Sequence, residues 1–430
     1  MRRKLKTPLL AASLTAFLGL GLHQVQAKDI TLHALMEDVP ETHIIESMLP
    51  EFQKETGIKV EFQKLVYSDM HDKLVAQLTG SSSFYNVLEV DFLWAGEFPA
   101  AGWLQPLQPM VDASKFDLAP FIPSMIDLVG KNQGTLYMIP MYNYSMGLIY
   151  RTDLLQDPKL QAAYKAKYNT DLAPPKTLAE YVRIASFMKD QAGIAGSAMQ
   201  GQRGDPNAME FSNYLFSSGG RYLDDQGHVA LDSPEARKAL TLYVDAIQHA
   251  AQKGALSATL DDTQRLMCSG AAFSFVTYWW MLPQVNDPKA CPKVAGKLAI
   301  AVMPGGHGES GGWGWGIPKN ESPALQKAAW TFIQWVQGEK ISIARAMEGH
   351  APVRSDVYQN ADVLKKYPYY KEAEQVVATG MAFPVFPYSA QYEDVLGTQL
   401  SLAASNQTDV DTAVKKAANG LADLQKKAGQ

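Results

Sequence analysis

Residues 29–94 alternate between short apolar runs and amphipathic segments, and this alternation limits the possible fold more than any other feature of the sequence. Strand-like runs at 29–35, 58–66 and 87–94 are separated by two patterns with helical spacing of the apolar residues. The third run is almost wholly apolar, which is typical of a buried parallel strand. This strand–helix–strand–helix–strand order predicts an α/β lobe at the N-terminal end.

Four polar or aromatic residues lie at the expected exits of these strands: Glu37, Tyr67, Asp91 and Trp94. Ligands of open α/β sheets bind beyond the carboxyl ends of the strands, so we expect these residues to border a ligand site. Asp91 is also compatible with an ordinary helix cap.

The N-terminal segment has the pattern of a cleavable signal peptide at residues 1–27. Four basic residues lie within the first six, an uncharged apolar stretch covers 9–22, and Val25 and Ala27 are small residues at the cleavage positions. The stretch is too short for a retained membrane anchor. Because Lys28 stands where a lipoprotein would carry Cys, we expect a periplasmic protein that is not lipid-anchored.

Removing 27 of the 430 residues leaves 403, which is more than one hydrophobic core usually organises, so we expect two lobes. The removed segment carries four positive charges, so the net charge of −5 becomes −9. This charge disfavours nucleic acid as a partner.

Cys268 and Cys291 are the two cysteines of the chain. In an oxidising compartment, such a pair is expected to form a disulfide. A zinc site would need further ligands, and the nearest histidine in sequence is His249, so we expect no metal.

Beyond the first three expected strands, the chain contains one long extended run from Leu136 to Tyr150, interrupted by Pro140. We interpret this run as the first crossing between lobes. A helix is expected around 178–188, and helices should dominate to about residue 285. A strand at 298–303, a helix that starts at Ser322 and Pro323, and a final helix over 410–424 complete the pattern.

Aromatic residues gather in two segments that suit a carbohydrate pocket. Residues 311–316 form a Gly-Trp alternation on an expected loop, and Tyr278, Trp279 and Trp280 follow a strand-like run. Glycine lets main chain approach a ligand, indole faces stack on the apolar patches of sugars, and polar side chains bind their hydroxyls. Either Trp279 or Trp280 alone is equally compatible with the core.

Arg203 and Arg354 lie in turn-rich segments, where each is compatible with an anionic group on a sugar, with solvation, or with bracing a lobe. Catalytic motifs such as GxSxG and HExxH are missing. An exported carbohydrate-active enzyme remains the alternative, although no spacing singles out a carboxylate pair. A receptor for peptides or metal chelates is a third reading.

With these segments in hand, the chain resembles the extracellular solute-binding proteins of ABC-type sugar importers. The resemblance runs the length of the mature chain and rests on the order of several short motifs: VDFLW at 90–94, AGWLQPL at 101–107, LYMIP at 136–140, YRTDLL at 150–155, GWGWGIPK at 312–319, AAWTFI at 328–333 and APVR at 351–354.

The resemblance implies a two-lobe α/β binding protein with no cofactor that closes over a sugar, polyol or sugar derivative. It implies a non-enzymatic, monomeric receptor that delivers its solute to membrane permease subunits. The expected lobes are 28–139 with 315–374, and 140–314 with 375–430. Family positions that commonly line the cleft correspond to Glu37, Asp91, Tyr142, Trp279, Gly312, Trp313 and Arg354. By location alone, Tyr67, Asn143 and Arg203 are added.

Overall fold

A five-stranded sheet organises the N-terminal lobe of the computed structural model, which describes residues 30–429. The predicted signal peptide lies outside the described residues. Strand β1 runs parallel to both of its neighbours, β2 and β3, and β10 is antiparallel to both β3 and β6. Across the sheet the strands are ordered β2 (Lys59–Leu65), β1 (Thr31–Glu37), β3 (Val87–Asp91), β10 (Gly312–Gly316) and β6 (Met138–Asn143).

The predicted alternation of strands and helices in the N-terminal lobe is confirmed. Helix α1 (Pro40–Thr56) follows β1, starts at a proline and ends at Gly57, whose φ of 77° is favourable only for glycine. Helix α2 (Tyr67–Leu78) joins β2 to β3. The helices that follow β3 and β10 are α3 (Glu97–Ala100), α4 (Gln108–Ser114), α5 (Pro123–Met125), α13 (Pro323–Val336), α14 (Glu339–Met347), α15 (Ser355–Tyr358) and α16 (Ala361–Lys366).

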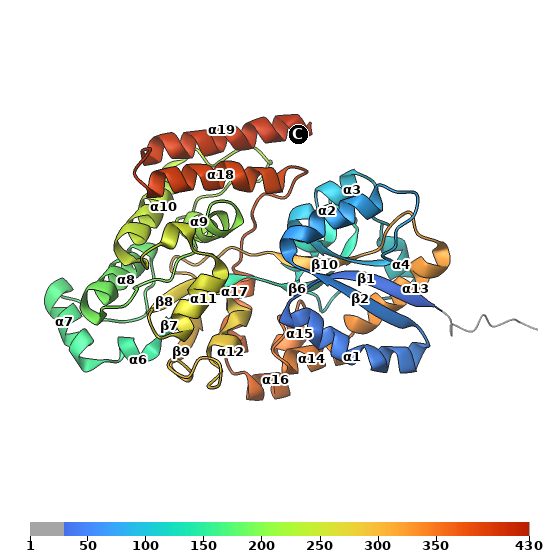
Figure 1. Ribbon diagram of the computed structural model, residues 1–430, viewed down its shortest axis with the longest axis horizontal. Helices are drawn as coiled ribbons and strands as arrows, with labels where there is room; N and C mark the ends of the chain where they lie inside the picture. The colour runs from blue at the N-terminus through green and yellow to red at the C-terminus, as the bar shows by residue number, and fades with distance from the viewer. Residues whose placement is uncertain (1–29, 430) are drawn as a thin grey trace, which may run out of the picture.

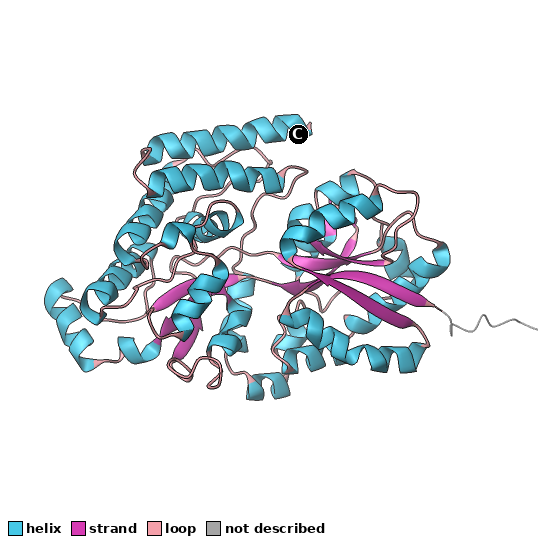
Figure 2. Cartoon of the chain, viewed as in Figure 1, coloured by secondary structure: helices cyan, strands magenta, loops and turns pink. Residues whose placement is uncertain are grey.

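The second lobe is built from helices around a three-stranded antiparallel sheet, as Figure 2 shows. Its strands are β8 (Ser274–Tyr278), β7 (Met146–Arg151) and β9 (Leu298–Ala301). Its helices are α6 (Thr152–Leu155), α7 (Pro158–Tyr168), α8 (Leu178–Ala192), α9 (Asp205–Ser217), α10 (Pro234–Asp245), α11 (Leu260–Cys268), α12 (Leu282–Val285), α17 (Tyr370–Ala378), α18 (Ser389–Ala404) and α19 (Val410–Ala428). Helices α18 and α19 pack against each other at the top of this lobe (Figure 1).

The chain passes from the first sheet to the second within two residues. Strand β6 ends at Asn143 and β7 begins at Met146, so both halves of the predicted extended run are strands of different sheets. The first sheet extends past the expected lobe limits at 139 and 315, because β6 continues to Asn143 and β10 already starts at Gly312. A small hairpin of β4 (Lys131–Asn132) and β5 (Thr135–Leu136) precedes β6. In the described part of the chain, no helix is long and apolar enough to span a bilayer.

The Gly-Trp segment is a buried strand, which corrects the expectation of a loop. A Cβ atom on Gly312 would lie 2.7 Å from the carbonyl oxygen of Tyr142, so this glycine allows close strand pairing and does not serve ligand approach. A β-bulge shifts the register between Trp313 and Gly314. Trp313 packs against Tyr142, whereas Trp315 is fully buried against Phe332 of α13.

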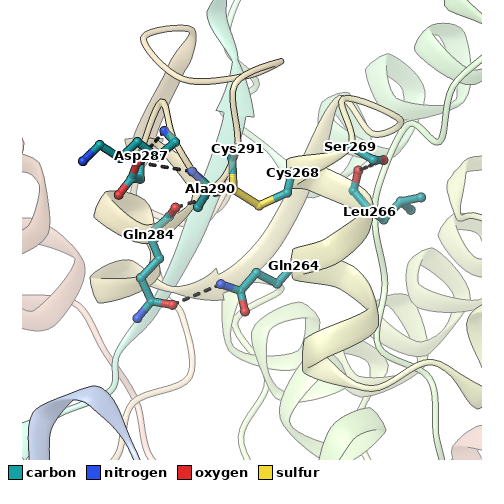
Figure 3. Close-up of a disulfide and its surroundings, with 9 residues drawn as sticks. Gln264, Leu266, Cys268, Ser269, Gln284, Asp287, Ala290 and Cys291 are labelled. Carbon is teal, nitrogen blue, oxygen red and sulfur yellow. Dashed lines mark hydrogen bonds between the residues drawn. A yellow bond between two sulfur atoms is a disulfide. The ribbon is translucent and has the colours of Figure 1, made fainter. Parts of the chain in front are cut away.

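The expected disulfide between Cys268 and Cys291 is present and joins the end of α11 to the segment after α12 (Figure 3). On the other side of the same two helices, Gln264 Nε2 donates a hydrogen bond to Gln284 Oε1 at 3.0 Å. These two contacts fix α11 and α12 to each other. No free cysteine remains in the described residues.

Replacing both cysteines in a Cys268→Ala/Cys291→Ala variant should lower the free energy of unfolding by roughly 3 kcal/mol. The disulfide closes a loop across a sequence separation of 23, and its loss restores entropy to the unfolded chain. Urea denaturation of the oxidised wild type, the reduced wild type and the variant checks this. The last two should agree, and an unchanged midpoint in both would contradict the prediction.

Candidate ligand-binding site

A cavity of about 680 Å³ lies between the two sheets, and the carboxyl ends of the first-lobe strands form one of its walls. Glu37 and Asp91 are the last residues of the parallel strands β1 and β3, so their side chains emerge at one edge of the sheet. Trp313 pairs in register with Asp91 on one side and Tyr142 on the other. The pairing of β10 therefore places an indole between carboxylate and phenol at this edge.

The opposite wall comes from the second lobe. It contains Asp205 at the start of α9, residues of α11 and α12, and two aromatic residues at the end of β8, Tyr278 and Trp280. Gln264 and Gln284 are held together by a hydrogen bond beside the disulfide (Figure 3). Both residues line the cavity. The brace between α11 and α12 thus supports part of the binding wall.

Aromatic rings line the cavity on both sides and contact one another. Trp313 stacks on Tyr142 with ring centroids 6.5 Å apart, and Trp280 stacks on Tyr278 at 5.7 Å. Tyr144, in the crossing between the lobes, lies edge-on to Tyr278 at 5.4 Å. Such rings offer flat apolar faces together with hydroxyl groups that can bond a polar ligand.

Three carboxylates of the cavity have raised pKa values. Burial, reinforced by the charge of Asp91, raises the pKa of Glu37 to about 7. Burial also raises the pKa of Asp91 to about 6, even though the Tyr144 hydroxyl donates to Asp91 Oδ1 at 2.6 Å. The side chain of Asp205 keeps exposed surface, yet burial and Asp91 raise its pKa to about 6. The ionised forms are therefore unfavourable in the unliganded cavity.

A buried ion pair stands at the edge of the cavity beside the crossing. Arg345, fully buried, donates to Glu41 Oε1 at 2.6 Å and to the carbonyl oxygen of Met141 in β6 at 3.2 Å. His350 contacts the second oxygen of Glu41. Burial acts against ionised Glu41, but its contacts with His350 and Arg345 outweigh it and lower the Glu41 pKa. Burial and Arg345 lower the pKa of His350 to about 4, so it is neutral at pH 7.

Six of the residues selected from the sequence line the cavity: Glu37, Tyr67, Asp91, Tyr142, Trp280 and Trp313. Trp94 lies one layer behind, because it is buried and stacks on Tyr67 with centroids 5.7 Å apart. Gly312 is enclosed by β6, as described above. Neither reaches the cavity surface.

The structure buries Asn143, the last residue of β6, against Trp279 of the second lobe. The indole Nε1 of Trp279 donates to Asn143 Oδ1 at 2.8 Å, and both side chains are fully buried. Trp279 packs edge-on against Tyr370 at 5.2 Å. Of the two adjacent tryptophans, the first is core and the second faces the cavity.

Neither predicted arginine reaches the cavity. Arg354 Nη2 donates to Asp356 at 2.6 Å and its Nη1 to the carbonyl oxygen of Gln337, so it braces the first lobe. Arg203 is exposed in the loop before α9. Asp205, two positions later and the first residue of α9, does line the cavity and was not predicted from the sequence.

Other lining residues missed from sequence include Tyr144, Tyr278, Gln264, Gln284, Glu41 and His350. Tyr144 and Tyr278 belong to segments already singled out for their aromatic content, whereas no sequence signal marks the two glutamines. In the described residues, no group of three or more His, Cys, Asp or Glu side chains is placed to hold a metal ion.

Comparisons with known proteins agree with this architecture. The sequence profile of the bacterial extracellular solute-binding protein family matches residues 38–342. A probable ABC transporter-binding protein of Deinococcus radiodurans is 25% identical over 74% of both chains. The maltose-bound MalE3 structure of T. maritima is 27% identical, with a TM-score of 0.80 over 92% of this chain and 100% of the other. A ribitol complex of a solute-binding protein from Agrobacterium radiobacter is 26% identical, with a TM-score of 0.79 over 93% and 99%.

Replacing Glu37 by Gln should stabilise the unliganded protein by roughly 2–3 kcal/mol at pH 7.5 and by less than about 1 kcal/mol at pH 5. The folded-state pKa of Glu37 is about 7 against 4.5 for the free group, so folding costs free energy as pH rises through this interval, and glutamine removes that cost. Urea denaturation at several pH values measures the difference.

The matched control is Glu235→Gln, an exposed position on α10. It should change stability little at either pH. A Glu37→Gln variant whose gain over the wild type does not shrink between pH 7.5 and pH 5 would contradict the assignment of a raised pKa to Glu37.

Proposed function

The chain belongs to the bacterial extracellular solute-binding proteins, and from that membership we infer that it is the carbohydrate-binding component of an ABC-type importer. Members of this family bind solutes and do not convert them, so the alternative of an exported carbohydrate-active enzyme is set aside. The relatives that bind maltose and ribitol support a sugar or polyol as the solute class.

The observation that carries this proposal is the pairing of aromatic rings from opposite lobes around one cavity. Trp313 with Tyr142 comes from the first lobe, and Trp280 with Tyr278 comes from the second. A sugar ring held between them would stack its C–H faces on the indoles, while Glu37, Asp91 and Gln264 accept or donate bonds to its hydroxyl groups. We therefore propose that the lining residues, and not the six positions named from sequence that lie outside it, contact the solute.

Binding would close the two lobes by a hinge motion about the segments that connect them. We place these crossings at 144–145, 302–311 and 367–369, between elements that belong to different sheets or pack on different lobes. The closed surface would then be recognised by the membrane permease subunits. We propose that the receptor acts as a monomer in the periplasm, exported without a lipid anchor, and that nucleic acid is not a partner.

Calorimetric titration of the mature protein with a panel of neutral sugars, polyols and sugar derivatives tests the proposal. At least one compound should evolve heat, raise the melting temperature and be recovered chemically unchanged. If no sugar-like compound does so, the carbohydrate assignment fails.

A Trp280→Ala variant should bind the active compound roughly tenfold more weakly, because it loses a stacking face of the cavity. Trp335→Ala, which removes an indole on α13 that packs against Phe52, is the matched control and should keep full affinity. Undiminished binding by the Trp280→Ala variant would contradict a stacking role for this indole.

A further inference from the structure

The charges that line the cavity are strongly unbalanced. Among residues 30–429, eight carboxylates line it and no lysine or arginine does. The only other titratable base in the lining is His350, which is neutral at pH 7 because its pKa is lowered to about 4. The eight are Glu37, Asp38, Glu41, Asp91, Asp205, Asp261, Asp287 and Glu348.

Partners outside the lining account for only two of these carboxylates. Glu41 is paired with Arg345, and Asp38 lies 2.8 Å from His43. The other six have no ion-pair partner within the described part of the chain: Glu37, Asp91, Asp205, Asp261, Asp287 and Glu348. The arrangement leaves no positive group to receive an anionic ligand, so a uronate or a sugar phosphate would add repulsion to a site that already carries it.

Three of the lining carboxylates come from both lobes, Glu37 and Asp91 from the first and Asp205 from the second. A further carboxylate, Glu309, is fully buried, and neither of its oxygens is bonded within the described residues. Burial raises the pKa of Glu309 and of Glu393, and the charges of Asp205 and Asp91 raise both values further. Buried carboxylates without partners are costly, and a cation among them would offset that cost.

The lining also contains seven aromatic rings from Tyr, Phe and Trp. Aromatic faces attract cations through their quadrupole, particularly where water is excluded, and they also stack on sugar rings. Acidic and aromatic groups in one cavity therefore suit a ligand that combines a positive charge with an apolar ring face.

We propose that the solute is a carbohydrate bearing a protonated amine, whose ammonium group binds among Glu37, Asp91 and Asp205 and whose ring stacks on Trp313 and Trp280. This inference rests on the proposed carbohydrate-receptor function and names its substrate class. Because the three carboxylates belong to different lobes, the ammonium group would also relieve repulsion between the lobes and favour closure.

The test compares matched sets whose members differ only in the group at C2 of each sugar ring. Glucose, glucosamine and N-acetylglucosamine form one set, and cellobiose, chitobiose and diacetylchitobiose another; galacto and manno sets extend the panel. In calorimetric titrations of the mature protein at pH 7, freed of co-purified ligand, the amine of at least one set should bind at least about tenfold more tightly than its hydroxyl and acetamido counterparts.

An Asp205→Asn variant distinguishes charge from shape. It should weaken binding of the amine by about tenfold or more and leave the affinity for the neutral counterpart unchanged or improved. Glu37→Gln gives the same contrast should Asp205→Asn fail to fold. Asp423→Asn, an exposed position on α19 with the same change in charge, is the control and should bind both compounds as the wild type does.

Equal affinity for amine and hydroxyl members of a set, or a parallel loss of both in Asp205→Asn, would overturn the charge proposal and leave the carbohydrate receptor intact. If putrescine binds and no carbohydrate does, or if no member of any set evolves heat or shifts melting, the carbohydrate function itself fails together with this inference.

Discussion

The buried guanidinium of Arg345 connects the parts of the molecule on which the cavity depends. It bonds Glu41 in the first turn of α1, a main-chain carbonyl of crossing strand β6, and the end of α13 through Val336. An uncompensated charge at this depth would be very costly, so the ends of these elements are held in one arrangement. The same cluster holds His350 at the cavity wall. One ion pair thereby joins the first turn of α1 to the strand that leads toward the second lobe.

The sequence predicted the fold well because it depends on patterns that extend over many residues. The alternation after β1, the exits of β1 and β3, and the cysteine pairing all follow from periodicity or compartment, and the family match confirms the two-lobe binding protein. Glu37 and Asp91, which line the cavity, could be selected from the sequence because the ends of strands can be recognised there. The prediction of a binding protein, as opposed to an enzyme, is likewise confirmed by the family match.

The direction of individual side chains was harder to predict, because adjacent residues point to opposite sides and only one of the two faces the cavity. Trp279 and Trp280 are adjacent in a short 3-10 turn, and only tertiary packing determines which indole meets Asn143. Similarly, a bulge in β10 lies between Trp313, which lines the cavity, and Trp315, which is fully buried in the core. Arg203 lies in the loop before α9 and Asp205 begins the helix, and the sequence carries no signal for which of them lines the cavity. Such choices are made by partners far away in the chain.

The disulfide makes one wall of the cavity sensitive to the redox conditions around the protein. Helices α11 and α12 form part of this wall, and the bond between Cys268 and Cys291 ties the end of α11 to the segment after α12. Where the environment keeps thiols reduced, this covalent tie is absent and only non-covalent contacts such as that between Gln264 and Gln284 hold the two helices together. A reduced chain would therefore have a looser wall and hold a solute less firmly than an oxidised one.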